Sequence, residues 1–323
     1  MVQALLEVKD LRTHFFTERG VLKAVDGVSF SVGEKETFGL VGESGCGKTV
    51  TSLSIMRRVP YPGKITGGEI RFMGENLLEK TDLEMRRIRG KEIAYIMQDP
   101  LTALDPVFRI GMQLDETVAA HLGLGSGEAR ERTLSLLDKV GIPSAKERVK
   151  DYQHQFSGGM RQRIVISIAL SCNPKLLIAD EPTTNLDVTI QAQILGLIKQ
   201  MNTEFGTSMI LITHHLGLVA ETVDRVGVMY AGDLVELADT KSLFNDTKHP
   251  YTLGLLKCIP RKEYRGVRLP TIGGTLPNLV DPPMGCKFHS RCPFVTDECL
   301  REKPRLEKVG REHEVACHHH FTD

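Results

Sequence analysis

The chain has no tryptophan, and only 6% of its 323 residues are aromatic. Such a composition argues against the broad aromatic platforms on which proteins stack single-stranded nucleic acid. Charge of one sign is not in excess either, because Lys and Arg total 41 and Asp and Glu also total 41. A strongly basic nucleic-acid-binding protein is therefore not indicated, and we expect no nucleic-acid partner.

Long apolar runs are also missing. The longest clear one, residues 164–172, is half of the roughly 18 residues that a membrane helix needs. The first ten residues carry acidic side chains and do not resemble a signal peptide. We therefore expect a cytoplasmic protein whose contact with a membrane is peripheral. Because disulfides are rare in that compartment, metal binding is the better explanation for a cysteine cluster near the C-terminus.

The pattern of apolar residues predicts an α/β fold. The first forty residues are strand-rich, and residues 101–155 show helical spacing that indicates a helical insertion. After it, apolar strands alternate with helices, which implies a largely parallel sheet with helices on its faces. We expect an ATPase domain over residues 1–260, with a helical subdomain at about 100–172, and a small irregular extension over 261–323.

Residues 42–49, GESGCGKT, fit the phosphate-binding pattern G-x-x-x-x-G-K-[ST] without exception. In such a P-loop, backbone N–H groups and the N-terminus of the following helix face the phosphate oxygens. Lys48 can reach the terminal phosphates, and Thr49 offers a hydroxyl to Mg²⁺. The predicted nucleotide-binding residues of this segment are Gly42, Glu43, Ser44, Gly45, Cys46, Gly47, Lys48, Thr49 and Val50.

A second chemical signal ends the apolar run KLLIAD at Asp180, which Glu181 follows. A buried strand would deliver Asp180 to Mg²⁺, and Glu181 could address the attacking water because successive strand residues point to different sides. Alone, the pattern equally fits a strand that ends in a solvated acidic turn. With a P-loop upstream, it predicts a site that hydrolyses ATP.

The segment FSGGMRQR, residues 156–163, places small residues at the start of a helix, where N–H groups are open to an anion. Its order between the P-loop and the Asp-Glu strand resembles the signature of ABC-type ATPases. The resemblance implies that the signature closes on the γ-phosphate held by a partner subunit, so that function needs a head-to-tail dimer. The signature residues that would bind nucleotide are Ser157, Gly158, Gly159 and Gln162.

Three further elements resemble the same family. Gln98 matches the glutamine that senses Mg²⁺ and water and lies where membrane partners dock, residues 183–187 match the D-loop, and His214 matches the switch histidine. The resemblance implies in-line attack of water on ATP, with Lys48, Gln98, Glu181 and His214 as the catalytic side chains. A histidine at a strand end can bind a γ-phosphate and orient Glu181.

Other positions depart from the family pattern or leave a choice open. Asn185 stands where a small residue is usual, and His215 stands where aspartate often follows the switch histidine. The residue that stacks on adenine is ambiguous: Phe15, Phe16 and Arg19 are candidates, and each could equally serve ordinary strand packing. Of these, Phe16 and Arg19 are the predicted nucleotide contacts.

The cysteines near the C-terminus follow the spacing Cys286-x5-Cys292-x6-Cys299-x17-Cys317. Zinc sites usually pair ligands two to four residues apart, whereas these longer intervals suit a larger object such as a [4Fe–4S] cluster. Spacing alone leaves an iron–sulfur cluster, zinc and coincidence open. Nearby histidines could serve zinc: His289, His313, His318, His319 and His320.

The segments HPYTLGLL, LPTIGGTLPNL, PPMGCKFHSRCPF, DPLTALDP and EPTTNLDVTIQAQIL resemble the ATPase subunits of oligopeptide and dipeptide ABC importers. The resemblance covers nearly the whole chain. It implies that Cys286, Cys292, Cys299 and Cys317 hold an iron–sulfur cluster, with zinc as the runner-up. It leaves Cys46, Cys172 and Cys258 as free thiols.

By the same resemblance, the protein is a peripheral ATPase at the cytoplasmic face of the inner membrane. Its expected partners are two permease subunits, a second ATPase subunit and an external solute-binding protein. An importer of nickel or another small solute is the main alternative. A soluble ABC ATPase that acts on nucleic acid or ribosomes is disfavoured by the single P-loop. A redox-regulated module without turnover is disfavoured by the intact Glu181 and His214.

Overall fold

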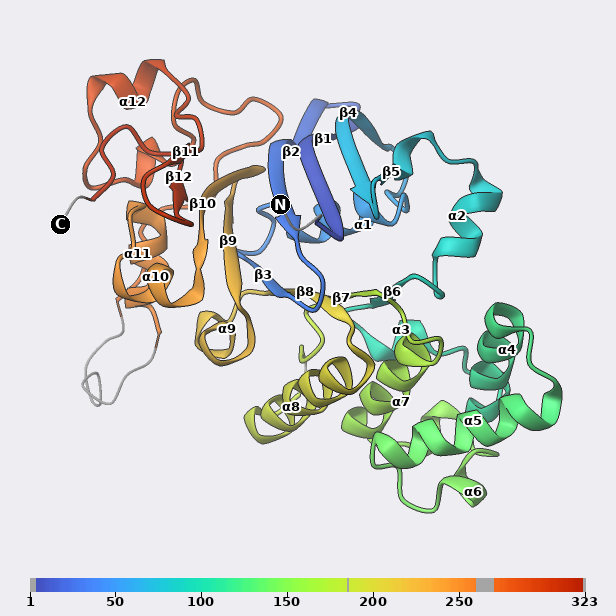
Figure 1. Ribbon diagram of the computed structural model, residues 1–323. Helices are drawn as coiled ribbons and strands as arrows, with labels where there is room; N and C mark the ends of the chain where they lie inside the picture. The colour runs from blue at the N-terminus through green and yellow to red at the C-terminus, as the bar shows by residue number, and fades with distance from the viewer. Residues whose placement is uncertain (1–3, 185, 260–269, 322–323) are drawn as a thin grey trace. The chain divides into compact units, whose positions relative to one another are not determined.

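The computed structural model describes residues 4–184, 186–259 and 270–321. The chain divides into two compact units, one formed by Met1–Leu78 with Ile212–Asp323 and the other by Glu79–Leu211. It passes from one to the other within η1, Leu77–Glu79, and returns within β8, Ser208–Thr213 (Figure 1). Both units contain strands and helices, and the predicted α/β class is confirmed.

The first unit begins with an antiparallel sheet in the order β2-β1-β4-β5. Its strands are β1 Leu6–Thr17, β2 Gly20–Val32, β4 Gly63–Phe72 and β5 Glu75–Asn76. This is the strand-rich N-terminal region that the alternating pattern predicts. Phe30 of β2 stacks on Phe38 of the following strand with ring centroids 4.9 Å apart, so aromatic packing joins the sheet to the P-loop strand.

The P-loop strand of this unit is β3, Thr37–Val41, which runs parallel to β9, Arg225–Tyr230. Beyond β9, the sheet continues antiparallel through β10 Asp233–Asp239, β12 Glu314–Val315 and β11 Glu307–Lys308. The helices of the unit are α1 Lys48–Ile55, α9 Leu216–Thr222, α10 Thr240–Asn245, α11 Pro250–Lys257, η4 His289–Arg291 and α12 Asp297–Arg301.

The second unit carries the parallel pair β6, Ile93–Ile96, and β7, Leu176–Asp180, with β8 beside β7. All five residues of β7 are buried, as its apolar sequence predicts. The helices of the unit are α2 Asp82–Ile88, α3 Pro100–Ala103, α4 Ile110–Leu122, α5 Ser126–Lys139, α6 Ala145–Arg148, η2 Gln153–Gln155, α7 Gly158–Leu170 and α8 Val188–Phe205. The helical character expected for residues 101–155 is confirmed.

The C-terminal region is more tightly joined to the sheet than its sequence suggests. Two residues of β12 pair with β10, in the register Glu236↔Val315 and Leu237↔Glu314. A two-residue strand leaves no periodic signal, so the pairing could not be read from the sequence. No helix in the described segments is both long and apolar enough to cross a membrane.

Candidate functional site

The P-loop connects β3 to α1 through glycines that no other residue could replace without strain. Gly42 has φ +151°, and a Cβ there would lie 2.2 Å from the Met229 carbonyl oxygen. Gly47 has φ +111°, and its Cβ would lie 2.4 Å from the Ala24 carbonyl oxygen. The loop therefore takes a path that only glycine allows, which is what a backbone that cradles phosphate requires.

Lys48 folds back over this loop and is only 4% exposed. Its Nζ donates to the carbonyl oxygens of Gly42, at 2.8 Å, and Glu43, at 3.0 Å. Cys46 is fully buried beneath it, and burial raises the pKa of the Cys46 thiol. The Cys46 thiol thus stays neutral and packs beneath the loop, whereas the Lys48 ammonium lies over the phosphate-binding loop.

In the second unit, β7 ends at the two predicted carboxylates. Asp180 is 2% exposed and accepts a 2.7 Å hydrogen bond from Tyr95 Oη of β6. Glu181 has φ +46°, a left-handed conformation that turns its side chain away from the strand direction. Its Oε2 accepts from Gln98 Nε2 at 3.1 Å and from Thr184 Oγ1 at 2.9 Å. The two carboxylates therefore have different partners.

This geometry brings Gln98, Asp180 and Glu181 together within one unit. Two of their partners were given no role from the sequence: Tyr95 was not singled out, and Thr184 appeared only within the D-loop, residues 183–187. Thr184 could have been suspected, because a hydroxyl three residues after a strand-end carboxylate can reach back to it. Tyr95 carried no signal, since only the parallel pairing of β6 with β7 brings its hydroxyl to Asp180.

The signature opens α7. Ser157 is its N-cap, and the hydroxyl accepts from the backbone N–H of Met160 at 3.4 Å. Gly158 and Gly159 follow, and a Cβ on Gly159 would lie 3.1 Å from Ile190 Cγ2. Gln162 is 1% exposed, and its Nε2 finds no hydrogen-bond partner among the described residues. Small residues thus keep the start of this thirteen-residue helix accessible, as an anion site needs.

The remaining predicted residues occupy varied surroundings. His214 directly follows β8 and is exposed, with its ring centroid 4.1 Å from that of His215. Phe16 is 46% exposed near the end of β1, and Arg19 is exposed in the adjoining turn. Both side chains are accessible to a nucleobase. Asn185 lies outside the described residues.

The predicted nucleotide residues are thus divided between the units. The P-loop, Phe16 and His214 belong to the first unit, while Gln98, the two carboxylates and the signature belong to the second. Hydrogen bonds join Gln98 to Glu181 in the second unit and Lys48 to the backbone of its own loop in the first.

The four C-terminal cysteines line one common pocket of the first unit. Its walls include Cys286, Cys292, Cys299 and Cys317, together with Phe288, Phe294, Pro304 and several histidines. Burial raises the pKa of Cys286 and of Cys317 to about 11, and it also raises the pKa of Cys292. Thiolates in such a pocket need a positively charged partner, since burial alone disfavours the charged form.

Among the described residues, these side chains do not form a ready metal site. Within residues 4–184, 186–259 and 270–321, no group of three or more His, Cys, Asp or Glu side chains could hold a metal ion. The described residues therefore give no support to the expected iron–sulfur cluster or to the runner-up zinc site.

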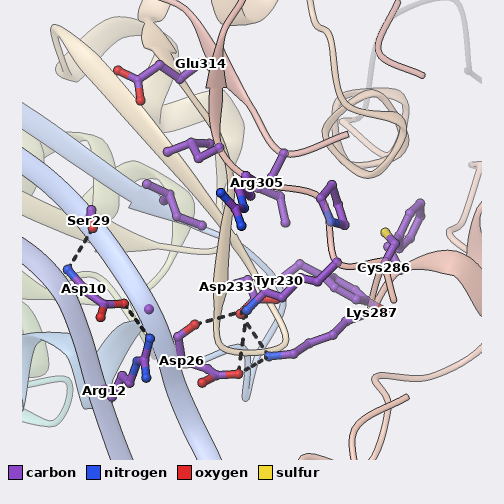
Figure 2. A pocket seen from close by; sticks show the side chains of 18 residues that line it. Asp10, Arg12, Asp26, Ser29, Tyr230, Asp233, Cys286, Lys287, Arg305 and Glu314 are labelled. Carbon is purple, nitrogen blue, oxygen red and sulfur yellow. Dashed lines mark hydrogen bonds and ion pairs between the residues drawn. The ribbon is translucent and has the colours of Figure 1, made fainter. Parts of the chain in front are cut away.

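Next to this pocket lies a polar one, also within the first unit (Figure 2). Lys287 Nζ reaches the Asp233 carboxylate at 2.9 Å and that of Asp26 at 3.4 Å, and only 5% of its side chain is exposed. Cys286 lines both pockets. Lys287 thus ties the cysteine segment to strands β2 and β10 through a buried ion pair.

A loop of this shape binds nucleotide phosphates, and its combination with the Ser-Gly-Gly helix start and the Asp-Glu strand end defines an ATPase of the ABC class. The family described as "ABC transporter" matches residues 25–184. The family described as "Oligopeptide/dipeptide transporter, C-terminal region" matches residues 235–299.

Curated relatives extend this similarity over the whole chain. The dipeptide transport ATP-binding protein DppD of Bacillus subtilis is 50% identical over 98% of this chain and 95% of its own length. DppD of Escherichia coli is 43% identical over 99% of this chain and 98% of its own. The chain belongs to the family of ATP-binding subunits of oligopeptide and dipeptide ABC transporters, and it is an ATPase.

A solved structure supports the fold. It is the dimeric post-hydrolysis state of an ATP-binding cassette bound to ADP and phosphate, and it covers 73% of this chain and 98% of its own. The TM-score is 0.65 at 23% sequence identity, which shows a shared fold.

Proposed function

We propose that this chain is the ATP-hydrolysing motor subunit of a membrane importer for dipeptides and oligopeptides. The observation that carries the proposal is the 50% identity to a dipeptide transport ATP-binding protein over 98% of the chain, C-terminal extension included. Import of nickel or another small solute is the alternative. The nucleotide motifs serve either solute equally, because permeases and binding proteins select what is carried.

The proposed roles follow from the division of the predicted nucleotide residues between the two units. Lys48 and the P-loop N–H groups would hold the phosphates, and Thr49, Gln98 and Asp180 would hold Mg²⁺, which would supply positive charge to the phosphate oxygens. Glu181 orients the attacking water. Support for separate roles comes from the distinct partners of Asp180, bonded to Tyr95, and Glu181, bonded to Gln98 and Thr184.

We further propose that His214 contacts the γ-phosphate and that the signature residues Ser157 to Gln162 act on nucleotide held by another ATPase subunit. The exposed position of His214 and the open, glycine-rich start of α7 are consistent with contacts to an added nucleotide. Phe16 and Arg19, both exposed, are the candidates for stacking on adenine. A head-to-tail dimer, of identical or similar subunits, follows from this assignment.

Permease subunits would dock on the second unit near Gln98. Large apolar side chains are exposed there on and around α3 and α4: Met97 by 40%, Leu101 by 53%, Val107 by 70%, Phe108 by 47% and Met112 by 49%. A cluster of this kind on a water-facing helical region suits a protein partner. The chain would then sit peripherally at the cytoplasmic face of the inner membrane, with a solute-binding protein on the other side.

For the cysteine pocket, we propose a [4Fe–4S] cluster held by Cys286, Cys292, Cys299 and Cys317. All four line one pocket with apolar walls. The cluster's contribution would be structural, since it ties together a segment with little core of its own.

The transport assignment is tested by uptake in cells whose own copy of this chain is replaced. Cells with the wild-type chain should import radiolabelled dialanine, and cells with Lys48→Ala should not, because the variant cannot hold the phosphates. Uptake of ⁶³Ni²⁺ is measured in parallel. Nickel uptake that requires Lys48, in cells that take up no dialanine, would replace the peptide assignment with the alternative.

A further inference from the structure

Glu43, the second residue of the P-loop, is held by a side chain from the distant C-terminal extension. Arg291 meets its carboxylate with both terminal nitrogens, Nη1 to Oε2 at 2.7 Å and Nη2 to Oε1 at 2.8 Å. The two-pronged geometry is the strongest form of such a pair. Only 4% of the Arg291 side chain is exposed, so water screens the interaction little.

The guanidinium is fixed from the side of the extension as well. Its Nε donates to the Gly273 carbonyl oxygen at 2.8 Å, and Nη2 also reaches the Ile272 carbonyl oxygen at 3.4 Å. It lies 5.7 Å from the centre of the Tyr230 ring. Arg291 is therefore a rigid strut and not a loose surface arginine.

Two more contacts join the C-terminal region to the same loop. The backbone N–H of Glu43 donates to Tyr251 Oη of α11 at 2.9 Å. A Cβ placed on Gly45 would lie 3.9 Å from Leu276 Cδ1, so this side chain lies beside the middle of the loop. Tyr251 packs in turn against Tyr230 and Phe288, with ring centroids 4.6 and 5.3 Å away. The loop is thus braced at its backbone, at its carboxylate and over its glycine.

The brace reaches the catalytic lysine in one step. Glu43 offers its carboxylate to Arg291 and its backbone carbonyl oxygen to Lys48 Nζ, at 3.0 Å. Movement of Glu43 would therefore shift a hydrogen-bond acceptor of Lys48. The generic P-loop pattern requires no acid at this position, so phosphate binding does not by itself explain the buried pair.

We infer that Arg291 is a positioning residue for ATP: by holding Glu43 it keeps the P-loop in its phosphate-binding shape, so that the C-terminal extension sets the affinity for nucleotide. The inference deepens the proposed ATPase role and rests on it. It does not require the peptide assignment, because nucleotide affinity is a property of the isolated protein.

The test is a double-mutant cycle on the purified full-length protein. Arg291→Gln and Glu43→Gln are made singly and together, with Arg301→Gln, an exposed arginine of α12, as the matched control. The affinity for a fluorescent ATP analogue with Mg²⁺ and the KM and kcat for ATP are measured. Iron content and the unfolding temperature are recorded for each variant.

We expect Arg291→Gln to weaken nucleotide binding and raise KM roughly 10-fold, within the usual range for coupled sites, with a smaller change in kcat. Arg291→Lys should recover only part of the loss, since it restores the charge but not the fork. The double variant should bind nucleotide no more weakly than the single variant with the lower affinity, because the two substitutions remove the same interaction. Arg301→Gln should match the wild type.

Unchanged affinity in Arg291→Gln would overturn the inference, and so would additive losses in the double variant. If Arg291→Gln fails to fold, the comparison of Arg291→Lys with Arg301→Gln decides. Full affinity in Arg291→Lys would then reject the need for a fork. Because binding is read on the isolated protein, a wrong transport assignment leaves this result intact, whereas a wild-type chain that binds no ATP would remove the proposed function itself.

Discussion

The P-loop and the cysteine pocket reach their geometry in opposite ways. The P-loop is eight consecutive residues, and its path follows from glycine conformations between one strand and one helix. The pocket gathers four cysteines from across residues 286–317, and contacts with other elements decide where each one lies. A contiguous site keeps its geometry as long as its local backbone conformation is kept. An assembled site depends on every segment that carries it, and that contrast predicts how each should fail.

The largest effect is expected from a substitution that removes a catalytic group and leaves nucleotide binding intact. Glu181→Gln should keep ATP binding and lower the hydrolysis rate by about 100-fold or more, because the amide cannot take a proton from the attacking water. Phosphate release and nucleotide binding are measured on the same preparation. Glu131→Gln, an exposed acid in the same unit, is the control. Hydrolysis at the normal rate would reject the role of Glu181.

The assembled pocket should instead lose its contents as a whole. Protein purified without oxygen should contain about four irons and four sulfides per chain, with a broad visible absorption. Cys292→Ser should lose both, and Cys258→Ser, a cysteine outside the pocket, should keep them. One zinc and no iron in the wild type would leave the ATPase intact and refute the cluster.

A third change tests what fastens the extension. Glu236 of β10 is fully buried and accepts hydrogen bonds from the backbone N–H groups of Lys248 and His249 and from His313 Nε2, the last at 2.8 Å. Glu236→Ala leaves these donors unpaired and should cost about 3 kcal/mol of unfolding free energy. Urea unfolding measures the loss. A loss within the error of the wild-type value would show that the β10–β12 pairing is sufficient alone.

Acid should weaken the same region. Burial lowers the pKa of His249 to about 4 from an ordinary 6.5, although the Glu236 carboxylate acts in the opposite direction. The unfolded chain therefore binds this proton more readily, so the stability contributed by neutral His249 is complete above 6.5 and is lost as the pH falls toward 4. Between pH 7 and pH 5 the loss is about 2 kcal/mol. His249→Asn should flatten the dependence, measured by urea unfolding at both pH values.

The smallest effect is expected at the surface of the polar pocket. Lys303 shares Asp233 with Lys287, and its Nζ lies 2.8 Å from the carboxylate, but 47% of its side chain is exposed. Water screens such a pair, so Lys303→Ala should cost about 0.5 kcal/mol. A loss above roughly 2 kcal/mol in urea unfolding would mean that Lys303 behaves like a buried charge.

The same contrast explains what the sequence could predict. The P-loop, the signature and the Asp-Glu strand end were recognisable because each is a short run whose local conformation makes the site. Arg291 could not be identified as a nucleotide-site residue, since nothing in an arginine before a cysteine indicates Glu43 as its partner. Tyr95 was missed for the same reason: its role depends on strand pairing. The resemblance to a family pointed to the four cysteines, and their shared pocket became visible only in the fold.

The contact between Arg291 and Glu43 can form only late in the synthesis of the chain. The two residues are 248 positions apart in the chain. At ordinary rates of translation, roughly 10–50 seconds separate the synthesis of the P-loop from that of the arginine that braces it. Until then the growing chain carries an ATP-binding loop without its counter-ion. If the strut sets nucleotide affinity as we infer, the chain acquires its full grip on ATP only when its synthesis is nearly complete, and a chain that stops early remains a weak competitor for ATP.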